Sequence, residues 1–147
     1  MDLKISTDKS LLDIDLIFQF LHNEARWSQG IPRILVEKAI LNSLCFGVYL
    51  NQAQIGFARV VTDCATFANL VDVFLVSEHR GKGFSRVLLE AINEHPDLQN
   101  IRRFMLATSN KKSLYAKFGF KELDQPEIFM EKFVPDVYES LIVANNE

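Results

Sequence analysis

Apolar and polar positions alternate along the chain in patterns that predict helices interleaved with strands. Apolar residues that recur every three or four positions mark one face of a helix, and they do so in three segments: 13–25, 34–41 and 84–94. Apolar runs bounded by polar turns are typical of strands, and they occupy five segments: 3–6, 45–50, 54–62, 68–76 and 103–107. A short helix is expected over 111–117.

The order of these elements favours an α/β (α+β) fold built on one sheet. Strands 45–50 and 54–62 are separated by a short polar turn, which predicts an antiparallel hairpin. A helix crosses between strands 68–76 and 103–107, and this is the connection that parallel neighbours require. The sequence therefore predicts a mixed, mostly antiparallel sheet that is flanked by helices and contains one parallel pair.

The C-terminal part of the chain carries further apolar runs. Two of them predict a closing hairpin over 120–123 and 128–133. Beyond these, Val137, Leu141 and Ile142 have the spacing of a short helix that docks on the domain.

The composition is that of one globular domain. The chain has 147 residues, of which 48% are hydrophobic and 24% charged, and no linker or repeat divides it. We expect a single domain over residues 1–134, followed by a C-terminal extension over residues 135–147.

Charge and hydropathy exclude several classes of partner. The net charge is −3, and the only dense basic runs, Arg102-Arg103 and Lys111-Lys112, are too short for a nucleic-acid surface. No window approaches the roughly 18 apolar residues of a membrane span, and the N-terminus lacks an apolar targeting segment. We therefore expect a cytoplasmic protein with no nucleic-acid or membrane partner.

The two cysteines do not suggest a metal site. Cys45 and Cys64 lie in apolar, strand-like surroundings, and neither has a cysteine or histidine at the spacing of zinc ligands. We expect two buried free thiols and no bound metal.

A glycine-bearing loop connects the most hydrophobic strand to the helix over 84–94. It reads Arg80-Gly81-Lys82-Gly83-Phe84-Ser85 and is followed by Arg86. The first turn of a helix has free N–H groups and the positive end of the helix dipole, and glycine lets a ligand approach that backbone closely. The loop therefore predicts a phosphate or pyrophosphate site, although it matches neither the Walker A nor the Rossmann pattern.

Two motifs resemble those of a known family. The segment from Asp72 to Ser85 is similar to the acyl-CoA-binding motif of the GNAT N-acetyltransferase superfamily, with Ser85 where the family has glycine or alanine. Downstream, Leu114-Tyr115-Ala116-Lys117-Phe118-Gly119-Phe120 is similar to the tyrosine-helix motif of that superfamily. Both motifs stand in the family's order, and the resemblance covers residues 3 to about 133.

The resemblance implies a GNAT-like domain in which the central parallel pair splays apart and binds acetyl-CoA as cosubstrate. The pantetheine would pair with the main chain of the splayed strand, and the pyrophosphate would lie on the glycine loop. The implied acetyl-CoA-binding residues are Val73, Phe74, Leu75, Arg80, Gly81, Lys82, Gly83, Phe84, Ser85, Arg86, Thr108 and Asn110.

The resemblance also implies catalytic roles. Tyr115 matches the tyrosine that protonates the leaving thiolate, and a phenol with an ordinary pKa of about 10 suits that task. Asp72 is the obvious carboxylate to take the proton of the attacking ammonium. Strand alternation places Asp72 on the opposite face from Val73, but a bulge would reverse this. The plain structural alternatives are a tyrosine packed on the sheet and an aspartate bonded to its neighbours.

The acceptor side of the site would involve Trp27 and Arg59, with Trp27 either walling the acceptor pocket or plugging the core. The implied function is transfer of acetyl from acetyl-CoA to a primary amine of a small molecule, by direct attack in a ternary complex. The alternatives are a transferase of a longer acyl group and a non-catalytic acyl-CoA-binding regulatory module. GNAT proteins often pair, so a homodimer is a further expectation.

Overall fold

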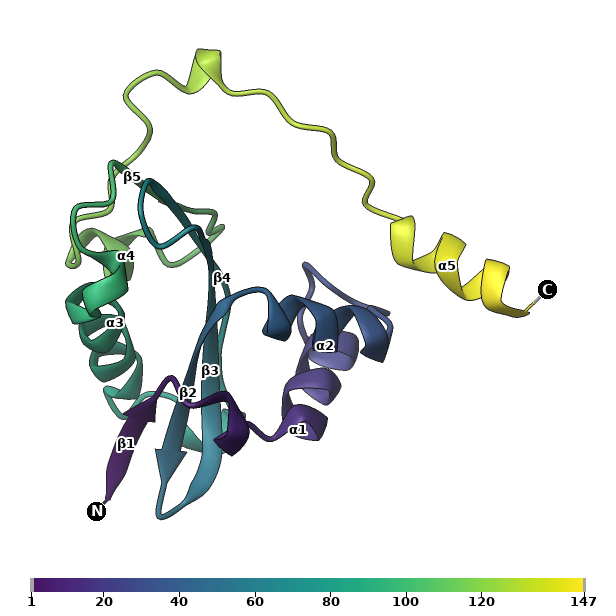
Figure 1. Ribbon diagram of the computed structural model, residues 1–147, viewed down its shortest axis with the longest axis horizontal. Helices are drawn as coiled ribbons and strands as arrows, with labels where there is room; N and C mark the ends of the chain where they lie inside the picture. The colour runs from purple at the N-terminus through teal and green to yellow at the C-terminus, as the bar shows by residue number, and fades with distance from the viewer. Residues whose placement is uncertain (1, 147) are drawn as a thin grey trace.

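The computed structural model describes residues 2–146, with side chains described as far as residue 141. A five-stranded mixed sheet forms its centre, with helices on both faces (Figure 1). The strands follow one another across the sheet in chain order: β1 (Leu3–Ser6), β2 (Leu44–Leu50), β3 (Ala53–Thr62), β4 (Phe67–Leu75) and β5 (Arg103–Leu106). Neighbouring strands are antiparallel except β4 and β5, which are parallel. The predicted fold class is confirmed.

The helices agree with the sequence patterns except in the first one. The longer helices are α1 (Ile14–Gln19), α2 (Arg33–Leu41), α3 (Phe84–Glu94), α4 (Lys112–Ala116) and α5 (Val137–Asn146). Short helical turns are η1 (Lys9–Leu11), η2 (Phe20–Glu24), η3 (Ser77–His79), η4 (Pro96–Leu98) and η5 (Pro126–Ile128). The predicted helix over 13–25 divides into α1 and the π-helical turn η2, because the N–H of Ala25 donates to the carbonyl of Phe20, five residues back, at 2.9 Å.

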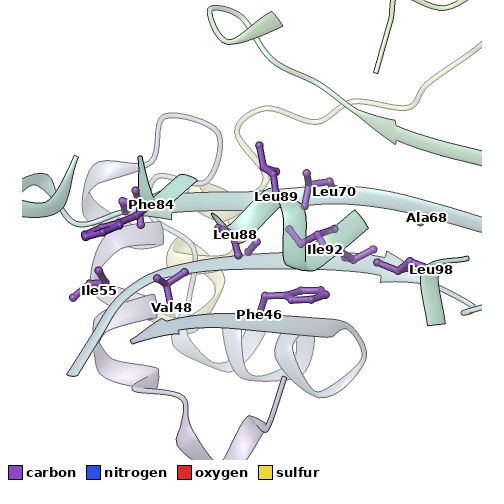
Figure 2. Packing of buried hydrophobic residues seen from close by; sticks show 13 residues of the cluster. Phe46, Val48, Ile55, Ala68, Leu70, Phe84, Leu88, Leu89, Ile92 and Leu98 are labelled. Carbon is purple, nitrogen blue, oxygen red and sulfur yellow. The ribbon is translucent and has the colours of Figure 1, made fainter. Parts of the chain in front are cut away.

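Two hydrophobic cores lie on opposite faces of the sheet. Figure 2 shows the first, in which Leu88 and Ile92 of α3 pack on Phe46 and Val48 of β2. The second lies between the sheet and the α1–α2 side, where Phe57 and Phe74 belong to the same buried cluster as residues of both helices. Because both faces of β3 and β4 are covered, these strands hold a fixed position between the two helical layers.

Strand β4 contains a bulge at its centre. Phe57 of β3 faces Phe74, and Arg59 faces Val71, so Asp72 and Val73 together oppose a single β3 residue. Asp72 adopts a φ of +54°, in the left-handed region that aspartate tolerates better than most residues. A bulge bends its strand and redirects its side chains.

Strands β4 and β5 pair over only part of their length. Their register runs from Phe67↔Arg103 to Leu70↔Leu106, and from Val71 onward β4 has no β5 partner. The splayed parallel pair is therefore present, and it opens where β4 bulges.

The predicted closing hairpin over 120–123 and 128–133 is wrong. No strand follows β5 as far as residue 146. The turn at η5, which begins at Pro126, leads the chain away from the edge of β5 before the second run could pair with it (Figure 1). Phe129 instead places its ring 4.8 Å from the guanidinium carbon of Arg103.

The C-terminal helix forms, and of its described side chains, those of residues 137–141, one packs against the rest of the domain. Val137 and Leu141 of α5 stay exposed, whereas Tyr138 is half-buried and packs against the second core. The side chain of Ile142 lies outside the described residues. Among the helices of residues 2–146, none is long and apolar enough to cross a membrane.

Only one of the two cysteines is buried. Cys45 lies in the second core, where burial raises the pKa of its thiol to about 11. Cys64 is exposed, contrary to expectation, because it occupies the turn between β3 and β4 with a φ of +61°. There its N–H donates to Oγ1 of Thr62 at 2.9 Å.

The contact between Gly56 and β4 supplies a test of this fold. A Cβ on Gly56 would lie 2.6 Å from Cδ2 of Leu75 and 2.8 Å from the carbonyl oxygen of Phe74. We expect Gly56→Ala to lower the free energy of unfolding by about 1–3 kcal/mol, since the backbone of β4 must shift. Urea denaturation measures this. Lys38→Ala, on the exposed face of α2, serves as the control, and equal stabilities of the two variants would contradict the close approach.

Candidate active site

A cleft of about 1020 Å³ opens where β4 and β5 diverge. Its floor is the unpaired part of β4, and its sides are the end of β5, the following loop, α4 and the loop after η2. The site residues predicted from the sequence that line it are Trp27, Asp72, Val73, Phe74, Leu75, Arg80, Gly81, Ser85, Thr108, Asn110 and Tyr115. Segments distant in sequence thus meet in one cavity.

The other predicted site residues stand outside the lining. Lys82, Gly83 and Arg86 are exposed at the start of α3, whereas Phe84 is buried in the first core, so only its main chain could meet a ligand. Arg59 does not line the cleft, but its Nε donates to the carboxylate of Asp72, which does.

Several residues that line the cleft were not predicted from the sequence. Arg26 and Lys111 add positive charge, and Met105 adds apolar surface. Arg26 adjoins Trp27, and Lys111 precedes the tyrosine motif, so proximity to the assigned residues was the available signal.

The floor of the cleft offers a row of unpaired main-chain groups. Residues 71–75 of β4 bond to β3 on one side only, because β5 ends at Leu106. An extended strand directs N–H and C=O groups to both of its sides. An extended ligand that carries amides can therefore pair with β4 as an added strand would.

The glycine loop leaves the first turn of α3 open. Gly81 and Gly83 have φ angles of +75° and +84°, which residues with a side chain rarely adopt, and Gly83 is the N-cap of α3. Because glycine has no capping side chain, the first N–H groups of α3 remain available to an anion. Arg80 ties the loop to β4, since its Nε donates to the carbonyl of Leu75 at 3.0 Å. The geometry and charge fit a pyrophosphate.

The carboxylate of Asp72 is held by two donors. Nε1 of Trp27 donates to one oxygen at 2.8 Å, and Nε of Arg59 donates to the other at 2.8 Å. Nη1 of Arg59 also donates to Oγ of Ser43 at 3.0 Å. The Asp72 side chain is 9% exposed and that of Arg59 19%, so this ion pair is shielded from bulk water.

The exposure of Trp27 and the bulge in β4 bear on two questions that the sequence left open. Trp27 is 59% exposed, so it does not plug the core. The bulge brings Asp72 and Val73 to the same cleft despite strand alternation. Each carboxylate oxygen of Asp72 has a second lone pair besides the one that accepts from Trp27 or Arg59.

Tyr115 projects from α4 into the cleft. Its ring meets that of Phe120 edge-to-face at 6.1 Å, which fixes its position. Burial raises the pKa of the Tyr115 phenol above its ordinary value of 10.0. The hydroxyl therefore keeps its proton throughout the neutral range and can donate it.

Comparison with known proteins decides the family. The model of the acetyltransferase (GNAT) domain matches residues 41–122, which is more than half of the chain. The chain belongs to the GNAT family of acetyltransferases. A GNAT-family acetyltransferase from Xanthomonas campestris pv. campestris, known from a crystal structure, is 49% identical and superposes with a TM-score of 0.91, covering 94% of this chain and 97% of its own. A match of that extent includes part of the segment after α4.

Two less similar proteins are also named as acetyltransferases. A protein of Gibberella zeae that is named as an acetyltransferase is 32% identical over 142 residues, covering 82% of this GNAT chain and 80% of its own. Glucosamine-6-phosphate N-acetyltransferase from Arabidopsis thaliana shares the GNAT fold at 17% identity, with a TM-score of 0.61 and coverage of 90% of this chain and 99% of its own.

A double-mutant cycle measures the coupling energy between Arg59 and Asp72. We expect Arg59→Met and Asp72→Asn to be non-additive in urea denaturation, with a coupling energy of at least about 1 kcal/mol, because the two side chains share a shielded charge-assisted bond. The same cycle with Arg33→Met and Asp15→Asn, an exposed pair, is the control and should give less. Additivity of the Arg59 and Asp72 variants would contradict the pairing.

Proposed function

We propose that this GNAT protein transfers acetyl from acetyl-CoA to a primary amine of a small molecule, by direct attack in a ternary complex. The observation that carries the proposal is the cleft itself. It joins the unpaired main chain of β4, the glycine-bearing start of α3 and the hydroxyl-bearing Tyr115 in one continuous cavity.

The acetyl-CoA would occupy the length of the cleft. Its pantetheine amides would pair with the main chain of residues 73–75, and its pyrophosphate would lie on the N–H groups of residues 81–86. Lys82 and Arg86 supply positive charge there. At the other wall, Oγ1 of Thr108 accepts from the N–H of Lys111 at 3.0 Å, which shapes the loop that carries Asn110. That loop would hold the pantetheine chain.

Asp72 and Tyr115 would manage the protons. Asp72 would accept the proton of the acceptor ammonium, and the free amine nitrogen would then attack the thioester carbon. As the carbon–sulfur bond breaks, the phenol of Tyr115 would give its proton to the thiolate, and the second proton lost by the attacking nitrogen would pass to the resulting phenolate. General acid and base groups contribute about 10²–10⁴-fold each, and positioning of both substrates supplies most of the remainder.

The acceptor would lie between Asp72 and the exposed indole of Trp27. An indole face attracts a cation. A carboxylate whose oxygens have unused lone pairs would accept hydrogen bonds from an ammonium group and so orient it. Arg59 acts in this arrangement as a positioning residue, because it holds Asp72 rather than the acceptor.

Binding of acetyl-CoA tests the cleft. We expect saturable binding in isothermal titration calorimetry and its loss in Gly83→Asp, because an aspartate there strains the loop and sets a negative charge beside the pyrophosphate. Gly30→Asp is the matched control, since Gly30 also has a positive φ (+80°) and open space around it. No binding by the unaltered protein would overturn the proposal.

Further outcomes separate the alternatives. Binding without turnover across a broad panel of amines would favour the regulatory module, and tighter binding and faster transfer with longer acyl-CoAs would favour a different acyl group.

Kinetics with a responsive amine test the proton-handling groups. We expect Tyr115→Phe to lower kcat by about 10²–10⁴-fold without weakening acetyl-CoA binding. The kcat of the unaltered protein should fall as the pH rises through the raised pKa of Tyr115, because only the protonated phenol donates. Asp72→Asn should also lower kcat. Unchanged kcat in either variant would refute the role of that residue.

A further inference from the structure

The turn that follows η2 brings two exposed side chains to one end of the cleft. We call residues 25–30 the acceptor turn. Arg26 and Trp27 of this turn both line the cavity. Nε1 of Trp27 donates to the carboxylate of Asp72 at 2.8 Å, so the turn meets the bulge of β4 where the acceptor amine is proposed to lie. Arg26, the preceding residue, therefore borders the space that the acceptor would occupy.

Hydrogen bonds within the chain hold the acceptor turn in a fixed shape. The N–H of Ala25 donates to the carbonyl of Phe20 at 2.9 Å, which closes a wide π-helical turn, a feature often found at functional sites. Ser28 is buried, and its Oγ donates to the carbonyl of Leu21 at 2.8 Å. Because the chain is anchored on both sides of Arg26, the backbone presents this residue to the cleft in one position. Such support is what a specific binding residue requires.

The guanidinium of Arg26 has no acidic partner in the described part of the chain. Among the residues whose side chains are described, no carboxylate lies within ion-pair distance of it. By contrast, Arg33 is paired with both Asp15 and Glu37. A guanidinium offers five N–H donors in a planar fork that matches a carboxylate or a phosphate group. Arg26 can therefore give its donors to an anionic ligand.

The other cations that line the cleft lie toward its cosubstrate end. Nε of Arg80 donates to the carbonyl of Leu75 beside the glycine loop, and Lys111 is the N-cap of α4. Asp72 is the one carboxylate among the described lining residues, and Arg59 is its ion-pair partner. The acceptor end of the cleft therefore joins one carboxylate, which suits an ammonium group, with the free guanidinium of the acceptor turn, which suits an anion.

We propose that Arg26 binds an oxyanion group of the acceptor, so that the acceptor is an amine that also carries a carboxylate or a phosphate group. The ammonium group meets Asp72 and Trp27, and the anionic group meets Arg26. Binding at two points of opposite charge fixes the direction from which the amine approaches the thioester. The inference rests on the proposed acetyl transfer, since the amine held at Asp72 is the one that reacts. Arg26 selects the acceptor and takes no part in the transfer of protons.

Kinetics with matched amines test this selection. The panel consists of ω-amino acids of increasing chain length, each with its carboxamide, together with phosphoethanolamine and ethanolamine. We expect kcat/KM to be about 10–100-fold higher for the acid-bearing member of the preferred pair, because a hydrogen-bonded charge pair is lost in the other. A preference within the amino-acid pairs identifies a carboxylate, and one within the ethanolamine pair identifies a phosphate. Equal kcat/KM within every pair would overturn the inference.

Variants of Arg26 assign the preference to this side chain. Arg26→Gln should remove the preference by raising KM for the acid-bearing amine, with little effect on its uncharged partner, and Arg26→Lys should restore part of it. Arg26→Glu should invert the preference in favour of a diamine of the same length. Arg102→Gln is the matched control, because Arg102 is also exposed and lies outside the lining of the cleft. An equal loss for both members of a pair in Arg26→Gln would refute the role of Arg26.

Binding can be measured without turnover, because Trp27 is the single tryptophan of the chain. Titration of the protein with the same amines in the presence of CoA should change its fluorescence saturably, and Arg26→Gln should weaken the apparent Kd of the acid-bearing amine by about 10–100-fold. Acetylation of amines without any preference for an acidic group would overturn this inference and leave the proposed function standing. Binding that depends on Arg26 without transfer to any amine would refute the proposed function and leave the anion site. Neither binding nor transfer would overturn both.

Discussion

The bulge in β4 at Asp72 is the constraint around which the site is arranged. β4 must keep its pairing with β3, because both flanking cores rest on these two strands. It must also diverge from β5, or no cleft would exist. The extra residue at Asp72 and Val73 satisfies both demands by bending the strand just beyond its last contact with β5 at Leu70. Trp27 and Arg59 donate to the carboxylate of Asp72 and so hold this residue in its left-handed backbone conformation.

The bend has a chemical consequence as well as a geometric one. It leaves main-chain groups of β4 facing the cleft, and it directs Asp72 into the same space as Tyr115. The glycine loop follows immediately in sequence, so the open strand and the open start of α3 form one continuous surface. A long ligand with amides at one end and phosphates further along matches this order.

Much of this arrangement follows from the sequence because it rests on local signals. The spacing of Leu88 and Ile92 predicts the buried face of α3, and Gly81 and Gly83 predict an open loop between β4 and α3. The bulge carries no such signal, since Asp72 lies in an otherwise ordinary apolar strand. The ion pair of Asp72 with Arg59 joins two strands and depends on that bulge, so it too required the structure.

The predicted hairpin over 120–123 and 128–133 was wrong for a different reason. Residues 128–133 do have the pattern of a strand, and the pattern reports a preference without naming the partner. Whether such a segment pairs depends on where its connection leads, and the turn at Pro126 leads it away from β5. Cys64 shows the same limit on a smaller scale, because its apolar neighbours belong to strands while it occupies the turn between them.

Amide hydrogen exchange with and without acetyl-CoA tests whether the ligand pairs with β4, because it reports on the main chain of that strand. Pairing of the ligand with the unpaired strand predicts slower exchange in residues 71–75 and 81–86 when acetyl-CoA is bound. Exchange in β2, which is already paired on both sides, should stay unchanged. Binding that leaves residues 71–75 exchanging as before would contradict the account.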